Sequence, residues 1–309
     1  MSRVHFSPDG RRLASISGYH HGQTLCVWQL PSGRLERTFT YKDATVTLSP
    51  DWKCLVYVDT TNQARIQLLQ FPGGHPLTSV TTDTLGVLAV SPQSQTLVCG
   101  GKDGRIRLWR VSDGSLVRVL DGHKYRVTAL AFSADGKFLA SGGADRTVRL
   151  WSASDGKLVN VFGEHGGRVL SVTFSARGEV LASGGDTGTI HLSRIADSNP
   201  LRKLRYGDGV TGLAFSSDST LLAACGTSDA GPTPSLFLWR VSDGKLLQIL
   251  MHEMEVACCV AFSPERKLLA AGCTDGTIRL FSPGGLKEEQ DPEKVDPEKG
   301  RWGQSLNSE

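Results

Sequence analysis

The sequence has 309 residues and a formal net charge of +3, from 34 Lys and Arg against 31 Asp and Glu. This near balance lacks the basic excess of a protein devoted to nucleic acid. Hydrophobic residues make up 39% of the chain, but no apolar run approaches the length that spans a bilayer. Specific nucleic-acid binding and membrane insertion are therefore not expected.

The cysteines and the first residues bear on the cellular compartment. The seven cysteines are an odd number and lack C-x-x-C or Cys/His spacing, so they predict neither a disulfide framework nor a zinc site. The first residues lack the apolar stretch of a secretory signal. We expect a cytoplasmic protein without metal or cofactor, and the same features fit a nuclear or cytoskeleton-associated protein.

The chain contains a repeat of seven units. Each unit ends in a short strand-like segment, and successive segment ends lie 40 to 46 residues apart. In chain order these segments are 25–28, 66–69, 106–109, 148–151, 190–193, 236–239 and 278–281. A period of this size is typical of architectures in which small units stack on one another.

Each unit reads as a series of short strands. In the fourth unit, residues 127–132 alternate in polarity, a Ser-Ala-Asp-Gly turn follows, and a second strand-like stretch spans 138–142. Alternation with period two predicts strands with one buried face, and Asp-Gly supplies tight turns. A lone sheet this short cannot bury both faces, so the units must stack, and radial stacking closes them into a ring. We predict an all-β fold, a seven-bladed β-propeller over residues 1–285.

Two sequence signals in the units point to a family. Gly122-His123 opens the fourth unit, and a Trp stands near the end of four units: Trp28, Trp109, Trp151 and Trp239. This pattern resembles the WD-repeat family, and the resemblance covers residues 1–285. The match is degenerate, because no Trp is followed by Asp. Other residues hold the Trp position in units two, five and seven: Leu69, Ser193 and Phe281.

The resemblance implies a hydrogen-bonded tetrad of His, Ser or Thr, Asp and Trp within a blade. Its one complete match in the sequence is His123, Ser141, Asp145 and Trp151. We expect blade four to be the most rigid blade, because a fully satisfied buried polar chain fixes one strand geometry. The same residue types could suggest a catalytic triad, but a triad needs an exposed nucleophile and an oxyanion hole, for which no motif is present. We therefore predict that the protein is not an enzyme.

The remaining motifs do not favour phosphate binding, lipid binding or a role as a ubiquitin-ligase receptor. Glycine-rich stretches such as 100–104 and 183–186 recur as turns, and we expect hairpin geometry with positive φ there. Arg11-Arg12 lies in a Gly-Arg-Arg-Leu turn rather than in the Phe/Leu-Arg-Arg-Gly motif of phosphoinositide-binding propellers. No unit ends in the Trp-Asp-x-Arg of cullin-ligase receptors. We expect no small-molecule substrate and no membrane partner.

The resemblance also implies that the loop entering each unit and the turn between its second and third strands share one rim, the usual partner-binding face. Tyr and Arg are enriched at binding hot spots, although they are also common on ordinary surfaces. The candidate partner-binding residues on this rim are Tyr41, Lys124, Tyr125, Arg126, Arg168, Tyr206, Met254 and Glu255, with Lys42, Lys102 and Arg146 beside them. Insertions at 18–23 and 227–235 lie on the same rim.

The favoured function is an interaction scaffold or adaptor that binds proteins or peptides on this rim, as a monomer within a larger complex. The alternative is a targeting or regulatory module of a larger assembly, such as a ubiquitin-ligase substrate receptor or a cytoskeletal or ciliary complex. The interpretation as an adaptor follows from the family resemblance and from the lack of a catalytic motif.

The two ends of the chain raise a question of closure. Residues 286–309 are polar and proline-punctuated, which predicts a disordered tail. Residues 4–6 already match the first strand of unit one, so no earlier segment is left to complete the last blade. We expect an incomplete blade seven, as in an isoform or fragment of a longer protein. The alternative is that residues 301–306 return as its outer strand.

Overall fold

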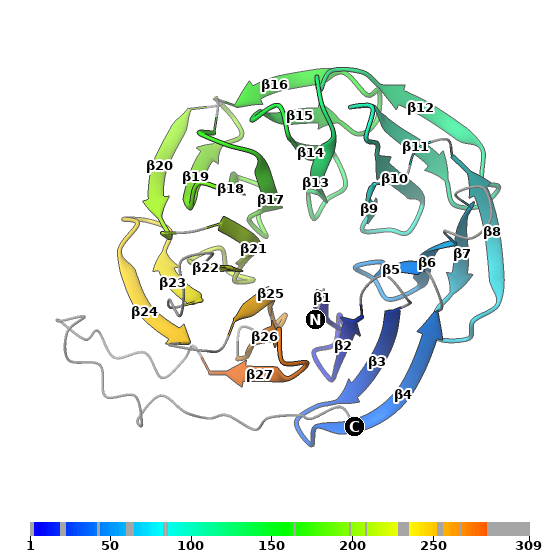
Figure 1. Ribbon diagram of the computed structural model, residues 1–309, viewed down its shortest axis with the longest axis horizontal. Helices are drawn as coiled ribbons and strands as arrows, with labels where there is room; N and C mark the ends of the chain where they lie inside the picture. The colour runs from blue at the N-terminus through cyan, green and yellow to red at the C-terminus, as the bar shows by residue number, and fades with distance from the viewer. Residues whose placement is uncertain are drawn as a thin grey trace.

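The computed structural model describes residues 3–18, 23–41, 44–59, 65–82, 84, 86–162, 165–197, 199–207, 209–227, 235–251, 256–265 and 267–282. In these ranges the secondary structure is 27 strands without a helix. The strands form seven antiparallel sheets that follow one another around a ring (Figure 1). The predicted all-β, seven-bladed propeller is confirmed.

Blades 1 to 4 each contain four strands, numbered from the centre outward. Blade 1 is β1 (Arg3–Phe6), β2 (Arg12–Ser17), β3 (Gln23–Gln29) and β4 (Arg34–Tyr41). Blade 2 is β5 (Ala44–Leu48), β6 (Cys54–Asp59), β7 (Arg65–Gln70) and β8 (Pro76–Thr81). Blade 3 is β9 (Val87–Val90), β10 (Thr96–Gly100), β11 (Ile106–Arg110) and β12 (Leu116–Leu120). Blade 4 is β13 (Val127–Phe132), β14 (Phe138–Gly143), β15 (Val148–Ser152) and β16 (Leu158–Phe162).

Blades 5 and 6 repeat this plan, and blade 7 has three strands within the described residues. Blade 5 is β17 (Val169–Phe174), β18 (Val180–Gly185), β19 (Thr189–Arg194) and β20 (Pro200–Arg205). Blade 6 is β21 (Gly209–Phe215), β22 (Leu221–Thr227), β23 (Leu236–Arg240) and β24 (Leu246–Met251). Blade 7 is β25 (Ala257–Phe262), β26 (Leu269–Cys273) and β27 (Ile278–Phe281). The predicted tail and the alternative strand at 301–306 lie outside the described residues.

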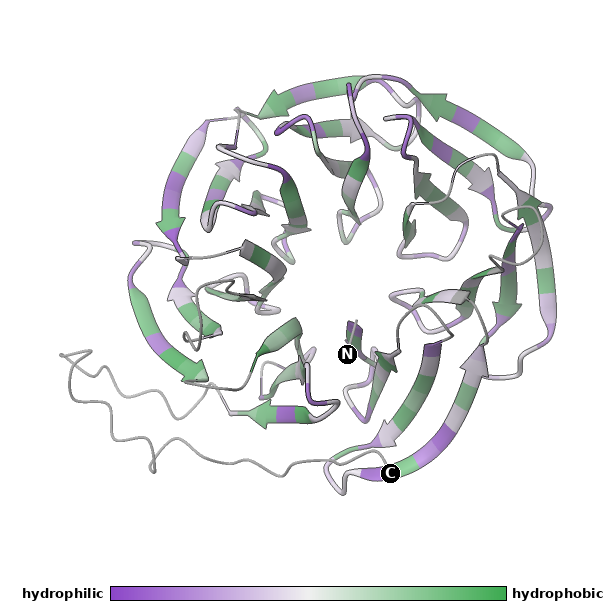
Figure 2. Ribbon diagram, in the orientation of Figure 1, coloured by the Kyte–Doolittle hydropathy of each residue, from purple (hydrophilic) through white to green (hydrophobic). Residues whose placement is uncertain are grey.

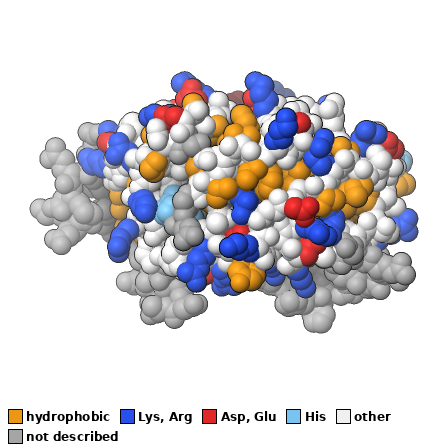
Figure 3. Space-filling model, turned by 90° about the horizontal axis from the view of Figure 1, so that it is seen from above, with side chains coloured by type: hydrophobic (Ala, Val, Ile, Leu, Met, Phe, Trp, Pro, Cys, Tyr) orange, Lys and Arg blue, Asp and Glu red, His pale blue; other side chains and the backbone are white. Residues whose placement is uncertain are grey.

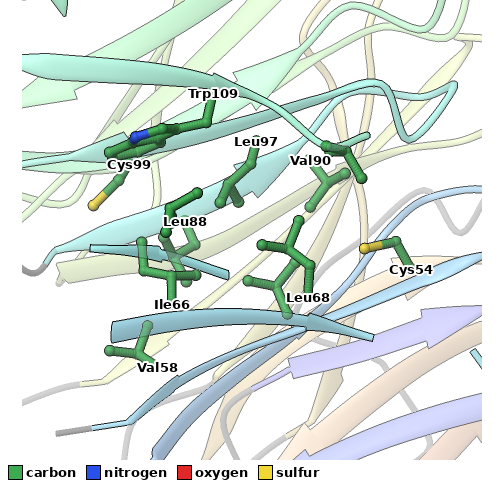
Figure 4. Packing of buried hydrophobic residues seen from close by; sticks show 12 residues of the cluster. Cys54, Val58, Ile66, Leu68, Leu88, Val90, Leu97, Cys99 and Trp109 are labelled. Atoms are coloured by element: carbon green, nitrogen blue, oxygen red, sulfur yellow. The ribbon is translucent and has the colours of Figure 1, made fainter. Parts of the chain in front are cut away.

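The hydrophobic core lies between neighbouring blades. In β7 the burial alternates, so Ile66 and Leu68 face blade 3, where they meet Leu88, Leu97 and Trp109 (Figure 4). Hydrophobic residues dominate the inner strands, and the outer strands mix both kinds (Figure 2). Because each blade buries its faces only against its neighbours, stacking supplies the stability that a lone sheet lacks.

The ring closes by packing between blade 1 and blade 7. Val4, Phe6 and Trp28 of blade 1 share one core cluster with Cys259 and Ile278 of blade 7. Within the described residues, every strand of blade 7 comes from the C-terminal part of the chain. Side-chain burial therefore joins the two ends of the ring.

Glycines at and just after the ends of the second strands have two different structural roles. Gly104 has a φ of 81°, as the turn prediction requires. The prediction of positive φ is wrong for Gly184, which instead lies where a Cβ would approach Cγ1 of Val210 in the next blade to 2.5 Å. The repeated Ser-Gly-Gly sequence thus permits close packing between blades.

Candidate functional site

The four predicted tetrad residues come together in blade 4. Nε1 of Trp151 donates to Oγ of Ser141 at 2.8 Å, and Nε2 of His123 lies 2.8 Å from the same oxygen. Nδ1 of His123 lies 2.9 Å from Oδ1 of Asp145. The chain of hydrogen bonds therefore links β15, β14, the loop before β13 and the turn between β14 and β15.

The charges of the tetrad fix the direction of its hydrogen bonds. Burial raises the pKa of Asp145, but hydrogen bonds from Lys124 N–H and from His123 outweigh burial and hold the pKa below its ordinary value. Burial lowers the pKa of His123, although Asp145 opposes this, so the imidazole is neutral near pH 7. A carboxylate only accepts, so His123 Nδ1–H donates to Asp145 and Nε2 accepts from Ser141 O–H. Every polar group in this chain has a partner.

The geometry of the tetrad does not suit Ser141 to nucleophilic attack. Its side chain is 0% exposed, and its oxygen already accepts the indole N–H of Trp151. A nucleophile must reach substrate and be flanked by oxyanion donors. The arrangement holds strands and a loop in place.

The tetrad also fixes the backbone of a rim loop, residues 121–126. Lys124 N–H donates to Oδ2 of Asp145 at 3.0 Å, and Ala144 N–H donates to the carbonyl of Arg126 at 2.8 Å. The loop is thereby bonded at two points to the turn between β14 and β15. The side chains of Lys124, Tyr125 and Arg126 remain exposed on it.

Backbone hydrogen bonds continue this rim across three blades. Val127 N–H donates to the carbonyl of Gly101 in blade 3 at 3.1 Å, and His165 N–H at the entry to blade 5 donates to the carbonyl of Arg146 at 2.9 Å. The rim of blades 3–5 is therefore one contiguous surface. We define it by six exposed residues: Lys102, Lys124, Tyr125, Arg126, Arg146 and Arg168.

Exposure and charge distinguish this rim. Tyr125 is 64% exposed, more than any other large hydrophobic side chain in the described ranges. Arg168 forms an ion pair with Asp186 at 2.9 Å. The other four cations of the rim form no ion pair with any residue that the structure describes. The rim thus offers one aromatic ring among cations.

Arg146 has an unusual backbone conformation. Its φ is 68°, whereas the corresponding turn positions of blades 3 and 5 hold Gly104 and Gly188. A non-glycine residue in the left-handed region costs on the order of 1 kcal/mol. The sequence alone could have suggested this, since Arg replaces a recurrent Gly.

The prediction that Tyr206 lies exposed on the rim is wrong. Tyr206 is only 7% exposed, and its hydroxyl donates to the carbonyl of Ser235 at 2.8 Å. Its N–H donates to the carbonyl of Gly188, as that of His165 does to Arg146, so Tyr206 occupies the tetrad-histidine position of blade 6. It packs on Phe237 and is unavailable to a partner.

The structure separates the remaining candidates. Tyr41 is half-buried at the end of β4, with its ring 5.0 Å from that of Tyr57. It belongs to blade 1 and does not adjoin the rim of blades 3–5. Lys42, Met254, Glu255 and most of both insertions lie outside the described residues.

The inner strands of the blades line a central channel with a volume of about 810 Å³. Its polar groups bridge blades: Arg3 donates to Thr47, Thr128 donates to the carbonyl of Val169, and Thr211 donates to that of Cys258. No group of three His, Cys, Asp or Glu side chains in the described ranges could hold a metal ion. These polar groups of the channel therefore form hydrogen bonds that join neighbouring blades.

An apolar belt runs along the outer strands of blades 3 and 4. Figure 3 looks onto this side, where hydrophobic side chains gather at mid-height and Lys and Arg lie above and below them. The exposed members of the belt are Leu116, Val117, Val119, Leu158, Val159 and Val161.

No helix in the described residues is long and apolar enough to cross a membrane.

Comparison with known families agrees with this geometry. The family model described as WD domain, G-beta repeat matches residues 68–110, 114–152, 156–192, 198–230 and 244–282. Its repeats cover most of the described ring. The chain belongs to the WD40-repeat family.

Two curated relatives are similar over part of the chain, both from Dictyostelium discoideum. The periodic tryptophan protein 2 homolog is 31% identical over 140 residues, 43% of this chain and 15% of the relative. The anaphase-promoting complex subunit cdh1 is 30% identical over 112 residues, 35% of this chain and 15% of the relative. The aligned segments thus span about 15% of the length of each relative.

Proposed function

We propose that the protein is a non-catalytic WD40 scaffold or adaptor that binds another protein through the rim of blades 3–5. The observation that carries the proposal is Tyr125, an exposed ring on a loop whose backbone is bonded to Asp145 and Ala144. A fixed backbone lowers the entropy lost on binding. Tyr and Arg side chains in such a setting are the commonest binding hot spots.

The thiols support a proposal for the cellular setting. Six of the seven cysteines are buried as free thiols, which suits a reducing compartment. We place the protein in the cytoplasm, as a monomer that joins a larger complex.

A second candidate is a targeting or regulatory module of a multi-subunit assembly. One relative is named as a subunit of the anaphase-promoting complex, which favours this class. The two candidates differ in the partners recovered: a regulatory module co-purifies with the core subunits of one enzyme complex, whereas a scaffold recovers several unrelated proteins.

The test is a comparison of two double variants. Proteins retained by the parent are identified by mass spectrometry and compared with those retained by Tyr125→Ala/Arg126→Ala. The matched control, Lys137→Ala/Arg177→Ala, removes exposed side chains at the opposite ends of the strands. We expect the first variant to lose a partner that the control keeps. If the folded first variant retained every partner, this rim would not be the binding site.

A further inference from the structure

We infer that the rim of blades 3–5 binds an acidic, extended segment of its partner protein. The inference rests on the proposed function and adds the chemistry of the partner. Four cations of the rim are exposed and form no ion pair with a described residue: Lys102, Lys124, Arg126 and Arg146.

Each acidic group that the structure describes near these cations already has a partner. Asp103 pairs with Arg107 at 2.9 Å, and Asp145 is held by His123 and by the N–H of Lys124. Asp186 pairs with Arg168, and Asp121 pairs with Arg105. Asp103, Asp121 and Asp186 each face a cation of their own, whereas Asp145 is held by neutral groups and keeps its negative charge. Among the described residues, the four unpaired cations therefore outweigh one buried carboxylate in the field outside the rim.

The backbone of Arg146 supports a binding role for its charge. Gly would take a φ of 68° without strain, as Gly188 does in the next blade with a φ of 70°. Positive φ at a non-glycine residue also occurs at Trp52, Ser94 and Ser219, in turns between first and second strands, so the conformation alone does not mark a site. At Arg146 it coincides with an exposed, unpaired cation on the rim. The strained residue here is a cation that lies between the loop of Arg126 and the entry to blade 5.

The surface suits an acidic peptide better than a nucleic acid. The chain as a whole carries only +3, and the rim has one exposed ring rather than a series of stacking platforms. Tyr125 instead provides an anchor for one apolar side chain between the cations. The expected ligand is a run of Asp and Glu around an apolar residue.

The probe is a fluorescein-labelled peptide of alternating Glu and Gly around one central Leu, measured by anisotropy against the full chain. The same peptide with Gln for Glu, and a single-stranded RNA of equal charge, are compared with it. We expect binding of the Glu peptide alone, weakened about tenfold or more as screening shortens from about 10 Å at 0.1 M salt to about 3 Å at 1 M.

The decisive variant is Arg146→Gly, which removes one charge and relieves the backbone. Combined with Lys124→Gln, it should weaken the Glu peptide about fivefold or more. Arg177→Gln, a charge change at the opposite ends of the strands, should leave binding unchanged. Equal binding of the Gln peptide, preferential binding of RNA or an unaffected double variant would each overturn the inference.

These outcomes separate the inference from the proposed function. If cellular partners were lost in Tyr125→Ala/Arg126→Ala while the Glu peptide failed to bind, the scaffold function would stand and the acidic ligand would be wrong. If the Glu peptide bound as expected while Tyr125→Ala/Arg126→Ala kept every cellular partner, the acidic surface would stand and the proposed function would fall.

Discussion

The second strands of blades 4 and 5 end with the same Ser-Gly-Gly motif, yet the two blades accommodate a buried histidine differently. In blade 4, Asp145 and Trp151 complete the hydrogen bonds around His123 and Ser141. In blade 5, Ser193 replaces the Trp, and His165 bonds to Ser183 and stacks on His191 with ring centroids 4.0 Å apart. A repeat can therefore keep its four-stranded fold without the Trp that completes the tetrad.

The two histidines also differ in electrostatics. Burial, with added repulsion from His191 and Lys203, lowers the pKa of His165 to about 4, and Asp186 opposes this only weakly. His123 is likewise shifted down by burial, but Asp145 partly restores its pKa. We therefore expect blade 5 to be the more acid-sensitive of the two.

The largest expected effect comes from the Trp of blade 4. Trp151→Ala removes a buried ring and leaves Ser141 without its donor, so we expect a loss of roughly 3–5 kcal/mol in the free energy of unfolding. Urea denaturation measures it. Tyr125→Ala, which removes an exposed ring, serves as control and should change stability by less than about 0.5 kcal/mol. A loss below about 1 kcal/mol for Trp151→Ala would refute the tetrad's structural role.

Acid should then distinguish blade 5. An unfolded histidine has a pKa near 6.5 and the folded His165 one of about 4, so the unfolded state binds the proton more readily between these values. Stability from this group is complete above about pH 6.5 and decreases as the pH falls toward 4, by up to about 3 kcal/mol. Urea unfolding at both pH values measures the loss, and His165→Gln should reduce it. An unchanged pH dependence in that variant would contradict the account.

Removing the matching carboxylate from each of the two blades should destabilise blade 4 more than blade 5. Asp145→Ala removes the carboxylate that accepts the buried N–H of His123 and leaves only Oγ1 of Thr147, 3.3 Å away, which should cost roughly 2 kcal/mol. Asp186→Ala in blade 5 breaks only a partly exposed ion pair with Arg168, which should cost less than about 1 kcal/mol. Thermal unfolding of both variants compares them. Equal losses would mean that the tetrad adds nothing to blade 4.

The smallest effect has the opposite sign. Arg146→Gly should raise stability by about 0.5 to 1 kcal/mol, because glycine adopts positive φ without strain. The gain is limited by the greater freedom of glycine in the unfolded chain. A lower melting temperature in this variant would show that the Arg146 side chain makes a stabilising contact.

Much of the fold could be predicted from the sequence, because the repeat spacing carries it. The spacing of Trp109 and Trp151 and the Ser-x-Asp-Gly turns fix strand order and blade number. The tetrad residues also come together in the structure, since they stand at recurrent positions of the unit.

Tyr206 shows where sequence reasoning fails. Tyr206 stands four residues before Val210, as His123 stands four residues before Val127, so this spacing assigns it to the interior position that His123 holds in blade 4. The prediction of an exposed Tyr relied on its place in a loop rather than on this spacing. The hydrogen bonds to Gly188 and Ser235 show the interior position directly.

The tetrad fixes the backbone of a rim loop whose side chains are exposed. Amide hydrogen exchange at Lys124 tests it most directly, because this N–H donates to the buried Asp145 although its own side chain is exposed. We predict slow exchange at Lys124 in the parent, and fast exchange in Asp145→Ala with blade 5 unchanged. Fast exchange at Lys124 in the folded parent would contradict the account.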